Sequence, residues 1–179
     1  FVVLTKYDLP IETYEKGSDL LKDENIFAYN LGELYRRKGD IPKMIESYLN
    51  ALEENPDRIR TIQTIFQRYF LPEDYEELQR QLYARLQENE NSAHNIELLT
   101  WVFVQRKDYK NALRQVRALD RRMRENGGRV FQLAEVAAND KDYDTAIDAY
   151  EYVVEKGNES PFYLEAKREA LRCKRSKIV

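Results

Sequence analysis

Residues 25–58 read NIFAYNLGELYRRKGDIPKMIESYLNALEENPDR, and this stretch decides the fold because its pattern recurs along the chain. Its central turn holds Asp40-Ile41. An aspartate followed by a bulky residue returns at intervals of 34 residues, as Asp74-Tyr75, Asp108-Tyr109 and Asp142-Tyr143. A fixed period of this length is typical of helical repeat arrays. The aspartates therefore divide the chain into repeats.

Apolar residues keep the same places in successive repeats. Nine residues before the aspartates stand Leu31, Ile65, Leu99 and Leu133; five before them stand Tyr35, Tyr69, Phe103 and Ala137; eight after them stand Tyr48, Leu82, Val116 and Tyr150. Within a repeat these and similar positions lie three, four or seven residues apart, which is the spacing of one face of an α-helix. Each repeat is therefore predicted to hold two amphipathic helices, helix A before the aspartate and helix B after it.

Each aspartate has a predicted role at this junction. Its carboxylate can accept hydrogen bonds from the free N–H groups of the first turn of helix B, so we expect it to be the N-cap. Asp74 with Glu77 three residues later predicts a capping box.

The residues of 25–58 resemble the tetratricopeptide repeat, whose pattern they match in Leu31-Gly32, Tyr35, Tyr48, Ala51 and Pro56. The resemblance covers nearly the whole chain and suggests a fragment of a longer, bacterial-type protein of this family. It implies an all-α, right-handed superhelical α-solenoid of stacked helix-turn-helix repeats. Repeat two departs from the pattern, because Phe66 and Leu78 stand where the family has small residues, and close packing of its two helices is in question.

The predicted organisation is one array without a globular boundary. Its parts are a partial repeat at 1–24, repeat one at 25–58, a degenerate repeat two at 59–92, repeat three at 93–126, repeat four at 127–160 and a terminal capping helix at 161–179. Residues 1–5 match the end of a helix A, so we expect the array to begin upstream of this chain. In the last segment the register slips. Ser160-Pro161 predicts a helix start, and an apolar stripe is predicted at Leu164, Ala166, Ala170 and Leu171.

Composition narrows the function classes. The net charge is −3 and the charged fraction is 34%, which suits two-faced surface helices and gives no general reason to expect nucleic acid. No Gly-rich phosphate loop, nucleophile elbow or metal-ligand cluster appears, so neither catalysis nor a cofactor is expected. No membrane span is expected either. The chain does not begin with Met, and so both the cytoplasm and the cell envelope stay open as locations.

One helix B carries a basic ridge, at Lys110, Arg114, Arg117, Arg121 and Arg124. Alone it suggests nucleic acid or an acidic partner. One period later, helix B of repeat four carries acids at Asp144, Asp148, Glu151 and Glu155. The two helices are neighbours in a stacked array, so the pattern predicts an ionic seam between repeats, and nucleic-acid binding is not the favoured interpretation.

In proteins of the resembled family, ligands lie on the concave face lined by helices A. Carried over to this sequence, the candidate groove residues are Tyr29, Glu33, Arg36, Gln63, Gln67, Phe70, Glu97, Trp101, Phe131 and Glu135. Aromatic residues and arginine are typical interface anchors, although these aromatics could equally pack on the adjacent repeat. Trp101 is the strongest single candidate, because it falls outside the core positions of its helix. The Lys/Asn set with which some members bind a C-terminal carboxylate is absent, so no such partner is expected.

The sequence therefore predicts a non-catalytic protein-interaction scaffold that binds a peptide or a helix in an aromatic-lined groove. One alternative is a structural spacer or a module that self-associates through the ends of the array. An RNA-binding helical repeat is a further alternative, and it depends only on the basic ridge.

Overall fold

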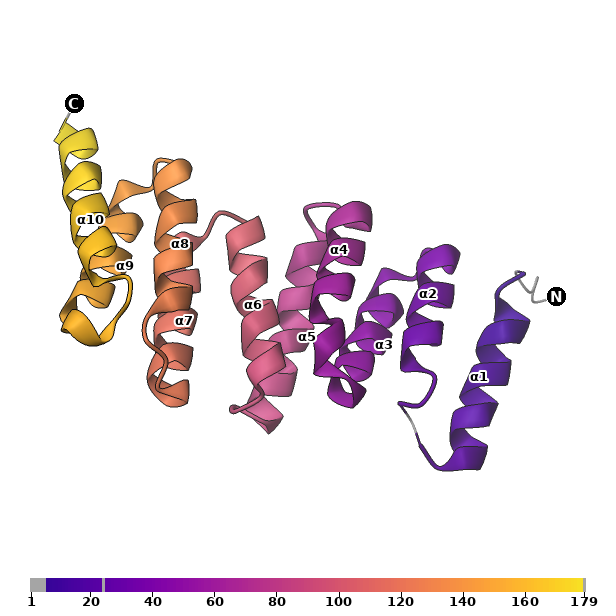
Figure 1. Cartoon of the computed structure of the whole chain (residues 1–179). Helices are drawn as coiled ribbons and strands as arrows, with labels where there is room; N and C mark the ends of the chain where they lie inside the picture. Colours follow the sequence, from indigo (N-terminus) through magenta and orange to yellow (C-terminus); the bar gives the residue numbers. More distant parts are fainter. Residues whose placement is uncertain (1–5, 24, 179) are drawn as a thin grey trace. The chain divides into compact units, whose positions relative to one another are not determined.

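The computed structural model describes residues 6–23 and 25–178, and all regular structure in these residues is helical (Figure 1). The helices are α1 (Asp8–Leu21), α2 (Ala28–Lys38), α3 (Ile41–Glu54), α4 (Ile59–Tyr69), α5 (Asp74–Glu88), α6 (Ala93–Gln105), α7 (Tyr109–Met123), α8 (Gly128–Asn139), α9 (Tyr143–Glu155) and α10 (Tyr163–Ile178), with 3₁₀ turns at Pro56–Arg58 and Gly157–Glu159. Pairs of helices follow the repeats, so the predicted all-α helical-repeat class is confirmed. The helix end predicted at residues 1–5 lies outside the described residues.

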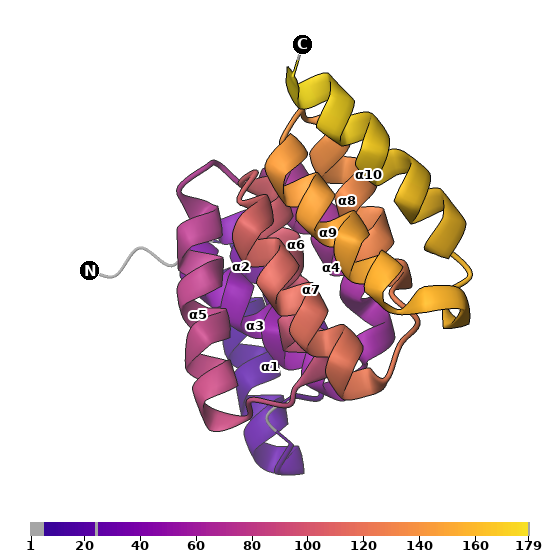
Figure 2. The same ribbon diagram turned by 90° about the vertical axis from the view of Figure 1, so that its left-hand side faces the viewer.

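The chain forms two compact units, residues 1–94 and 95–179. The first holds α1 to α5. The second holds α7 to α10 and nearly all of α6, which begins at Ala93. Within the units, the backbones approach most closely between α2 and α3, between α8 and α9, and between α9 and α10. Figure 2 shows α10 lying alongside α9. Each unit therefore stacks sequence-adjacent helices, which is how repeat proteins build a continuous core.

The turn between helix A and helix B is built in the same way in three repeats. Gly39, Lys107 and Lys141 adopt left-handed backbone conformations, with φ of 81°, 57° and 66°. The next residue is the aspartate, and its N–H donates back to the last turn of helix A, as in a Schellman motif. The carboxylates of Asp40, Asp108 and Asp142 then accept from the N–H three residues on, at 3.2, 3.3 and 3.2 Å. The predicted N-caps are confirmed at these three positions.

Repeat two uses a different turn, and the predicted capping box at Asp74 is wrong. Asp74 is already the first residue of α5, and its carboxylate accepts from the N–H of Leu71 at 2.8 Å, within the turn. The chain leaves α4 extended at Phe70, with ψ of 139°. Pro72 follows within two residues and disfavours the helical conformation at Leu71, so α4 does not continue through this turn. Glu77 pairs with Arg80 instead of reaching back to Asp74.

Helix A and helix B of repeat one meet at a glycine. A Cβ added to Gly32 of α2 would lie 2.8 Å from Cδ1 and Cε1 of Tyr48 on α3, whose ring is fully buried. In repeat two, Phe66 and Leu78 occupy the equivalent small-residue positions and are also fully buried.

The register slip at the end of the chain has a simple structural cause. The connection from α9 to α10, which contains the Gly157–Glu159 turn, is longer than the connection from α3 to α4, so α10 takes up the position of a helix A with a spacing of 36 rather than 34 residues from α8. Val130 of α8 then corresponds to Ala166, Ala134 to Ala170 and Ala137 to Cys173, and all of these are buried. The predicted apolar stripe is therefore half wrong: Leu164 and Leu171 are exposed, and Cys173 takes the place that the 34-residue period gives to Leu171.

We expect Gly32→Ala to destabilise the protein by about 1–2 kcal/mol. Overpacking against the buried Tyr48 ring costs about 1–3 kcal/mol, which exceeds the gain of up to about 1 kcal/mol from replacing glycine inside a helix. Urea denaturation followed by circular dichroism measures the change. Asn30→Ala, at an exposed position of the same helix, is the control and should be neutral or slightly stabilising. A stabilised Gly32→Ala variant would show that α2 and α3 do not pack this closely.

Candidate interaction grooves

Within the described residues, three grooves lie between helices A of the same unit. Groove 1 separates α2 from α4, has a volume of about 470 Å³, and is lined by Tyr29, Glu33, Arg36, Thr61, Thr64, Ile65, Arg68 and Tyr69. Groove 2 separates α6 from α8, has a volume of about 210 Å³, and is lined by Glu97, Thr100, Val104, Val116, Leu119, Arg129, Gln132, Leu133 and Val136. Groove 3 separates α8 from α10, has a volume of about 380 Å³, and is lined by Glu135, Ala138, Asn139, Tyr143, Tyr150, Glu165, Arg168, Glu169, Arg172, Cys173 and Ser176.

Grooves 1 and 2 are built from equivalent positions. Adding two periods, 2 × 34 = 68 residues, converts Tyr29 and Arg36 of α2 into Glu97 and Val104 of α6. The same shift converts lining residues of α4 into those of α8: Thr61 into Arg129, Thr64 into Gln132, Ile65 into Leu133 and Arg68 into Val136. The groove is therefore a property of the repeat geometry, while its chemistry is set by the residues at these positions.

Groove 1 is lined mostly by polar and charged residues, and contacts within the protein already hold its wall in place. Arg36 binds Glu33 in a bidentate ion pair, with Nη2–Oε1 at 2.6 Å and Nε–Oε2 at 2.9 Å. The same guanidinium stacks on the ring of Tyr69, 4.3 Å from its centroid. The ion pair with Arg36 lowers the pKa of Glu33 to about 2, although partial burial opposes the shift. Groove 1 therefore presents a fixed ionic pair beside an exposed tyrosine.

Tyr69 departs from its predicted place in the core. It stands in an apolar column whose other members, Tyr35, Phe103 and Ala137, are buried, yet it is 43% exposed. Its ring supports the Arg36 guanidinium, a cation–π contact that stabilises both side chains at the edge of the groove.

Groove 2 is mainly apolar. Val104 of α6 faces Leu133 and Val136 of α8, and Val116 and Leu119 of α7 form the floor. The side chain of Val136 is 41% exposed, which is unusual for a valine in a core-forming helix. An apolar hollow open to solvent gains free energy when an apolar group of a ligand covers it, at roughly 25 cal/mol per Å² of buried apolar area.

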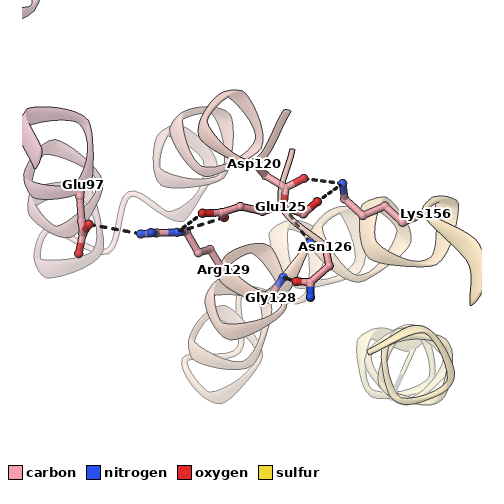
Figure 3. Close-up of polar contacts among 8 residues, drawn as sticks. Glu97, Asp120, Glu125, Asn126, Gly128, Arg129 and Lys156 are labelled. Atoms are coloured by element: carbon pink, nitrogen blue, oxygen red, sulfur yellow. Dashed lines mark hydrogen bonds and ion pairs between the residues drawn. The ribbon is translucent and has the colours of Figure 1, made fainter. Parts of the chain in front are cut away.

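One end of groove 2 is charged, as Figure 3 shows. Arg129 at the start of α8 donates from Nε to both carboxylate oxygens of Glu125, at 2.9 and 3.1 Å, and from Nη1 to Glu97 of α6 at 3.3 Å. Arg129 thus bridges the two helices that border the groove. Its side chain is 44% exposed, and so this ion pair is accessible to a ligand as well.

A buried carboxylate fixes the turn that carries Glu125 and Arg129 (Figure 3). Asp120 of α7 is fully buried; it accepts from the N–H of Gly127 at 2.8 Å and from the hydroxyl of Tyr152 at 2.8 Å. Nζ of Lys156 lies 2.6 Å from Asp120 and donates to the carbonyl of Glu125 at 3.0 Å. The hydrogen bond to Asp120 raises the pKa of Lys156. Because the Asp120–Gly127 and Lys156–Glu125 hydrogen bonds both end on the α7–α8 turn, the network holds that end of groove 2 in place.

Sequence reasoning did not single out Asp120 or Lys156. A signal was present, because Asp120 lies four residues after Val116 on the buried face of helix B, where an ionisable residue requires a partner. Gly127 adds to the constraint: its φ is 88°, and a Cβ there would lie 3.2 Å from Cδ of Lys156. A side chain at this position would therefore strain the turn and press on the lysine.

The candidate residues chosen from the sequence are distributed among different surroundings. Tyr29, Glu33 and Arg36 line groove 1, Glu97 lines groove 2 and Glu135 lines groove 3. Gln63, Gln67, Phe70 and Trp101 line none of these three grooves; Phe70 stacks on Phe66, with ring centroids 4.5 Å apart. Phe131 is only 5% exposed and packs between Tyr150 and Phe162, with centroid distances of 5.5 and 5.1 Å.

Four of the missed groove residues share one property: they lie on the flank of helix A that faces the preceding repeat. The positions carried over from the resembled family include only the flank that faces the following repeat. A groove between two helices needs one flank from each, and so Thr64, Arg68, Gln132 and Val136 were left out. Examining both flanks of each helix A would have found them.

The predicted ionic seam between α7 and α9 is wrong at Glu151 and Asp144. Glu151 pairs with Lys174 at 2.6 Å and Asp144 pairs with Lys177, so both carboxylates of α9 turn to α10. The basic ridge meets α9 through other groups: Arg117 donates to the carbonyl oxygen of Asp148, and its guanidinium lies over the ring of Tyr152, 5.1 Å from the centroid. At Arg117 the ridge therefore meets α9 through a backbone carbonyl and an aromatic ring instead of a carboxylate.

No family model matches the chain, and no curated protein shows significant similarity to it. Among residues 6–23 and 25–178, no helix is both long and apolar enough to cross a membrane. The same residues contain no cluster of three or more His, Cys, Asp or Glu side chains suited to hold a metal ion.

The depressed pKa of Glu33 predicts acid sensitivity in the first unit. A carboxylate whose pKa is about 2 when folded and about 4.5 when unfolded contributes stability above pH 4.5, and this contribution is lost as the pH falls toward 2. The ¹³C shift of the Glu33 carboxyl should titrate near pH 2, and the stability difference between wild type and Glu33→Gln should shrink below pH 4.5. Glu12→Gln, which removes the exposed carboxylate near Lys16, is the control. An unchanged difference from pH 7 to pH 3 would contradict the assignment.

Removing the buried charge at Asp120 should destabilise the second unit. Asp120→Asn keeps the shape but leaves the Lys156 ammonium without its carboxylate, and we expect a loss of about 3 kcal/mol in urea denaturation. In the double variant Asp120→Asn/Lys156→Met no unpaired cation is left, and part of the loss should be recovered. A loss below about 0.5 kcal/mol for Asp120→Asn would show that the network does not hold the turn.

Proposed function

We propose that this chain is a non-catalytic interaction module that binds a peptide or a helix of a partner protein in the grooves between its helices A. The observation that carries the proposal is groove 2, an apolar hollow open to solvent, with Val136 exposed and a bridging Arg129 at one end. The resemblance of residues 25–58 to the tetratricopeptide repeat supports it further, because members of that family bind peptides on this face.

The size of groove 2 favours a side chain over a small molecule. Its volume of about 210 Å³ is below the roughly 300–1,000 Å³ typical of small-molecule sites. It would accept one apolar side chain of a peptide, and the ligand's backbone or a neighbouring charge would meet Arg129 and Glu97. Groove 1 would add polar and aromatic contacts through Arg36, Tyr69 and Tyr29.

The groove proposal changes which residues are expected to anchor a ligand. Trp101 and Phe131 were the natural residues to replace on sequence grounds. The burial of Phe131 means that its replacement by alanine would damage the core and confuse loss of binding with loss of fold. Val136 and Tyr69 are better test positions, because each lines a groove and is more than 40% exposed.

A random-peptide library displayed on phage and selected on the wild-type chain tests the proposal. We expect selected peptides with an apolar anchor to bind Val136→Glu at least tenfold more weakly, because the variant places a charge in the apolar hollow. Leu71→Glu, which makes the same change at an exposed leucine in the α4–α5 turn, should leave the affinity unchanged. Peptides that depend on groove 1 should weaken similarly with Tyr69→Ala.

Chemical-shift mapping locates the bound peptide independently of the variants. Shifts confined to residues outside the three grooves, or equal affinity for wild type, Val136→Glu and Tyr69→Ala, would overturn the proposal. Failure to select any peptide, together with a mass that rises with concentration in light scattering, would favour the alternative of a self-associating module.

A further inference from the structure

Helix α10 carries an exposed apolar line that the grooves do not use. Leu164, Leu171 and Ile178 are 77%, 62% and 86% exposed. They are seven residues apart, which places them on one line along the helix, two turns between successive members. Their opposite face, with Ala166, Ala170 and Cys173, is the one buried in the second unit. The apolar line is therefore the outer face of α10.

The flanks of this line are basic on both sides. On an α-helix, Lys167 and Lys174 border the line on one side and Arg168 and Arg175 on the other. Residues Tyr163–Ile178 contain six Lys and Arg and two Glu, 6 − 2 = +4, in a chain whose net charge is −3. Both glutamates, Glu165 and Glu169, lie away from the line and line groove 3.

Some of these cations already have partners, and the others are available. Lys174 pairs with Glu151 on α9, and Arg168 pairs with Glu165 and Glu169 on its own helix. Within residues 6–23 and 25–178, neither Lys167 nor Arg175 forms an ion pair with a carboxylate. The ammonium group of Lys167 lies over the ring of Tyr163, 5.9 Å from the centroid. Each side of the apolar line thus holds one cation that is not paired with a carboxylate among the described residues.

We propose that the outer face of α10 docks an amphipathic helix of a partner protein whose apolar seam is flanked by acidic residues. The seven-residue spacing is the repeat that lets two helices keep an apolar seam in contact over several turns. The basic flanks select the partner, because charges beside such a seam set partner choice by attracting opposite and repelling like charges. This proposal does not rest on the function of the grooves.

Two other occupants fit less well. A second copy of α10 would bring lysines and arginines against each other on both flanks, which costs free energy. A membrane surface would attract the cations, but helices that lie in a membrane interface bury a broad apolar face, whereas α10 offers a single line of three side chains. An acidic helix satisfies both the line and the flanks.

The test uses two designed 21-residue peptides with leucine at heptad positions a and d. One has glutamate at positions e and g, and the other has lysine there. Fluorescence anisotropy at two salt concentrations measures binding to the whole chain. We expect the glutamate peptide to bind at least tenfold more tightly than the lysine peptide, and to weaken at high salt.

Variants at exposed positions then assign the surface. Leu171→Ser should weaken binding of the glutamate peptide at least tenfold, while Leu20→Ser, at an 84% exposed leucine of α1, should leave it unchanged. The double variant Lys167→Glu/Arg175→Glu should narrow or reverse the preference between the two peptides. Circular dichroism confirms that each variant keeps its helix content.

Several results would overturn the proposal. They are failure of the glutamate peptide to bind, binding that Leu171→Ser does not weaken, and a peptide preference that survives the double charge reversal. Dimerisation in sedimentation experiments that Leu171→Ser abolishes would assign the face to a second copy. Binding to vesicles of anionic phospholipid that Leu171→Ser abolishes, without binding of the glutamate peptide, would assign it to a membrane.

Discussion

The close approach of helix A to helix B is the constraint on which the repeats depend. At Gly32 a missing Cβ lets the Tyr48 ring pack directly on the α2 backbone. Short, pre-shaped turns make this approach possible: a left-handed residue ends helix A and an aspartate caps helix B in the next step. Because one pair of helices cannot bury both of its apolar faces, each repeat must pack on the next. Within each unit, the flanks of consecutive helices A are then left facing each other, and the grooves lie between them.

Packing sets the register more strictly than the sequence period does. Between α8 and α10 the spacing grows to 36 residues, yet Ala166, Ala170 and Cys173 still reach the core positions. The longer connection between α9 and α10, residues 156–162, takes up the extra residues outside the core helices. Cys173 illustrates the outcome, since burial raises the pKa of its thiol and makes it a packing residue rather than a reactive one. In repeat two, Phe66 and Leu78 are both fully buried, and the turn between the two helices differs from the others.

The sequence was sufficient to predict the helices, their pairing and most core columns, because these depend on periodic burial. It was insufficient wherever a residue's role depends on a neighbour from another repeat. Tyr69 belongs to a core column but is exposed under Arg36, and Phe131 belongs to a lining column but is buried against Phe162. Asp120 and Lys156 lie 36 residues apart and were not paired in advance. The partners of Asp144 and Glu151 depended on the register of α10, which the slip obscured.

Equivalent positions with different chemistry are what allow such a fold to carry specificity. The same geometry gives Arg36 and Arg68 in groove 1 but Val104 and Val136 in groove 2. In groove 1 the charge of Arg36 is already balanced by Glu33, so a ligand there gains more from the tyrosine faces than from a new ion pair. In groove 2 the gain comes from covering exposed valines, with Arg129 fixing orientation. On α10 a narrow line of exposed apolar side chains runs between two rows of cations. Each surface therefore favours a different kind of contact, although all three are built on helices that occupy the same place in the repeat.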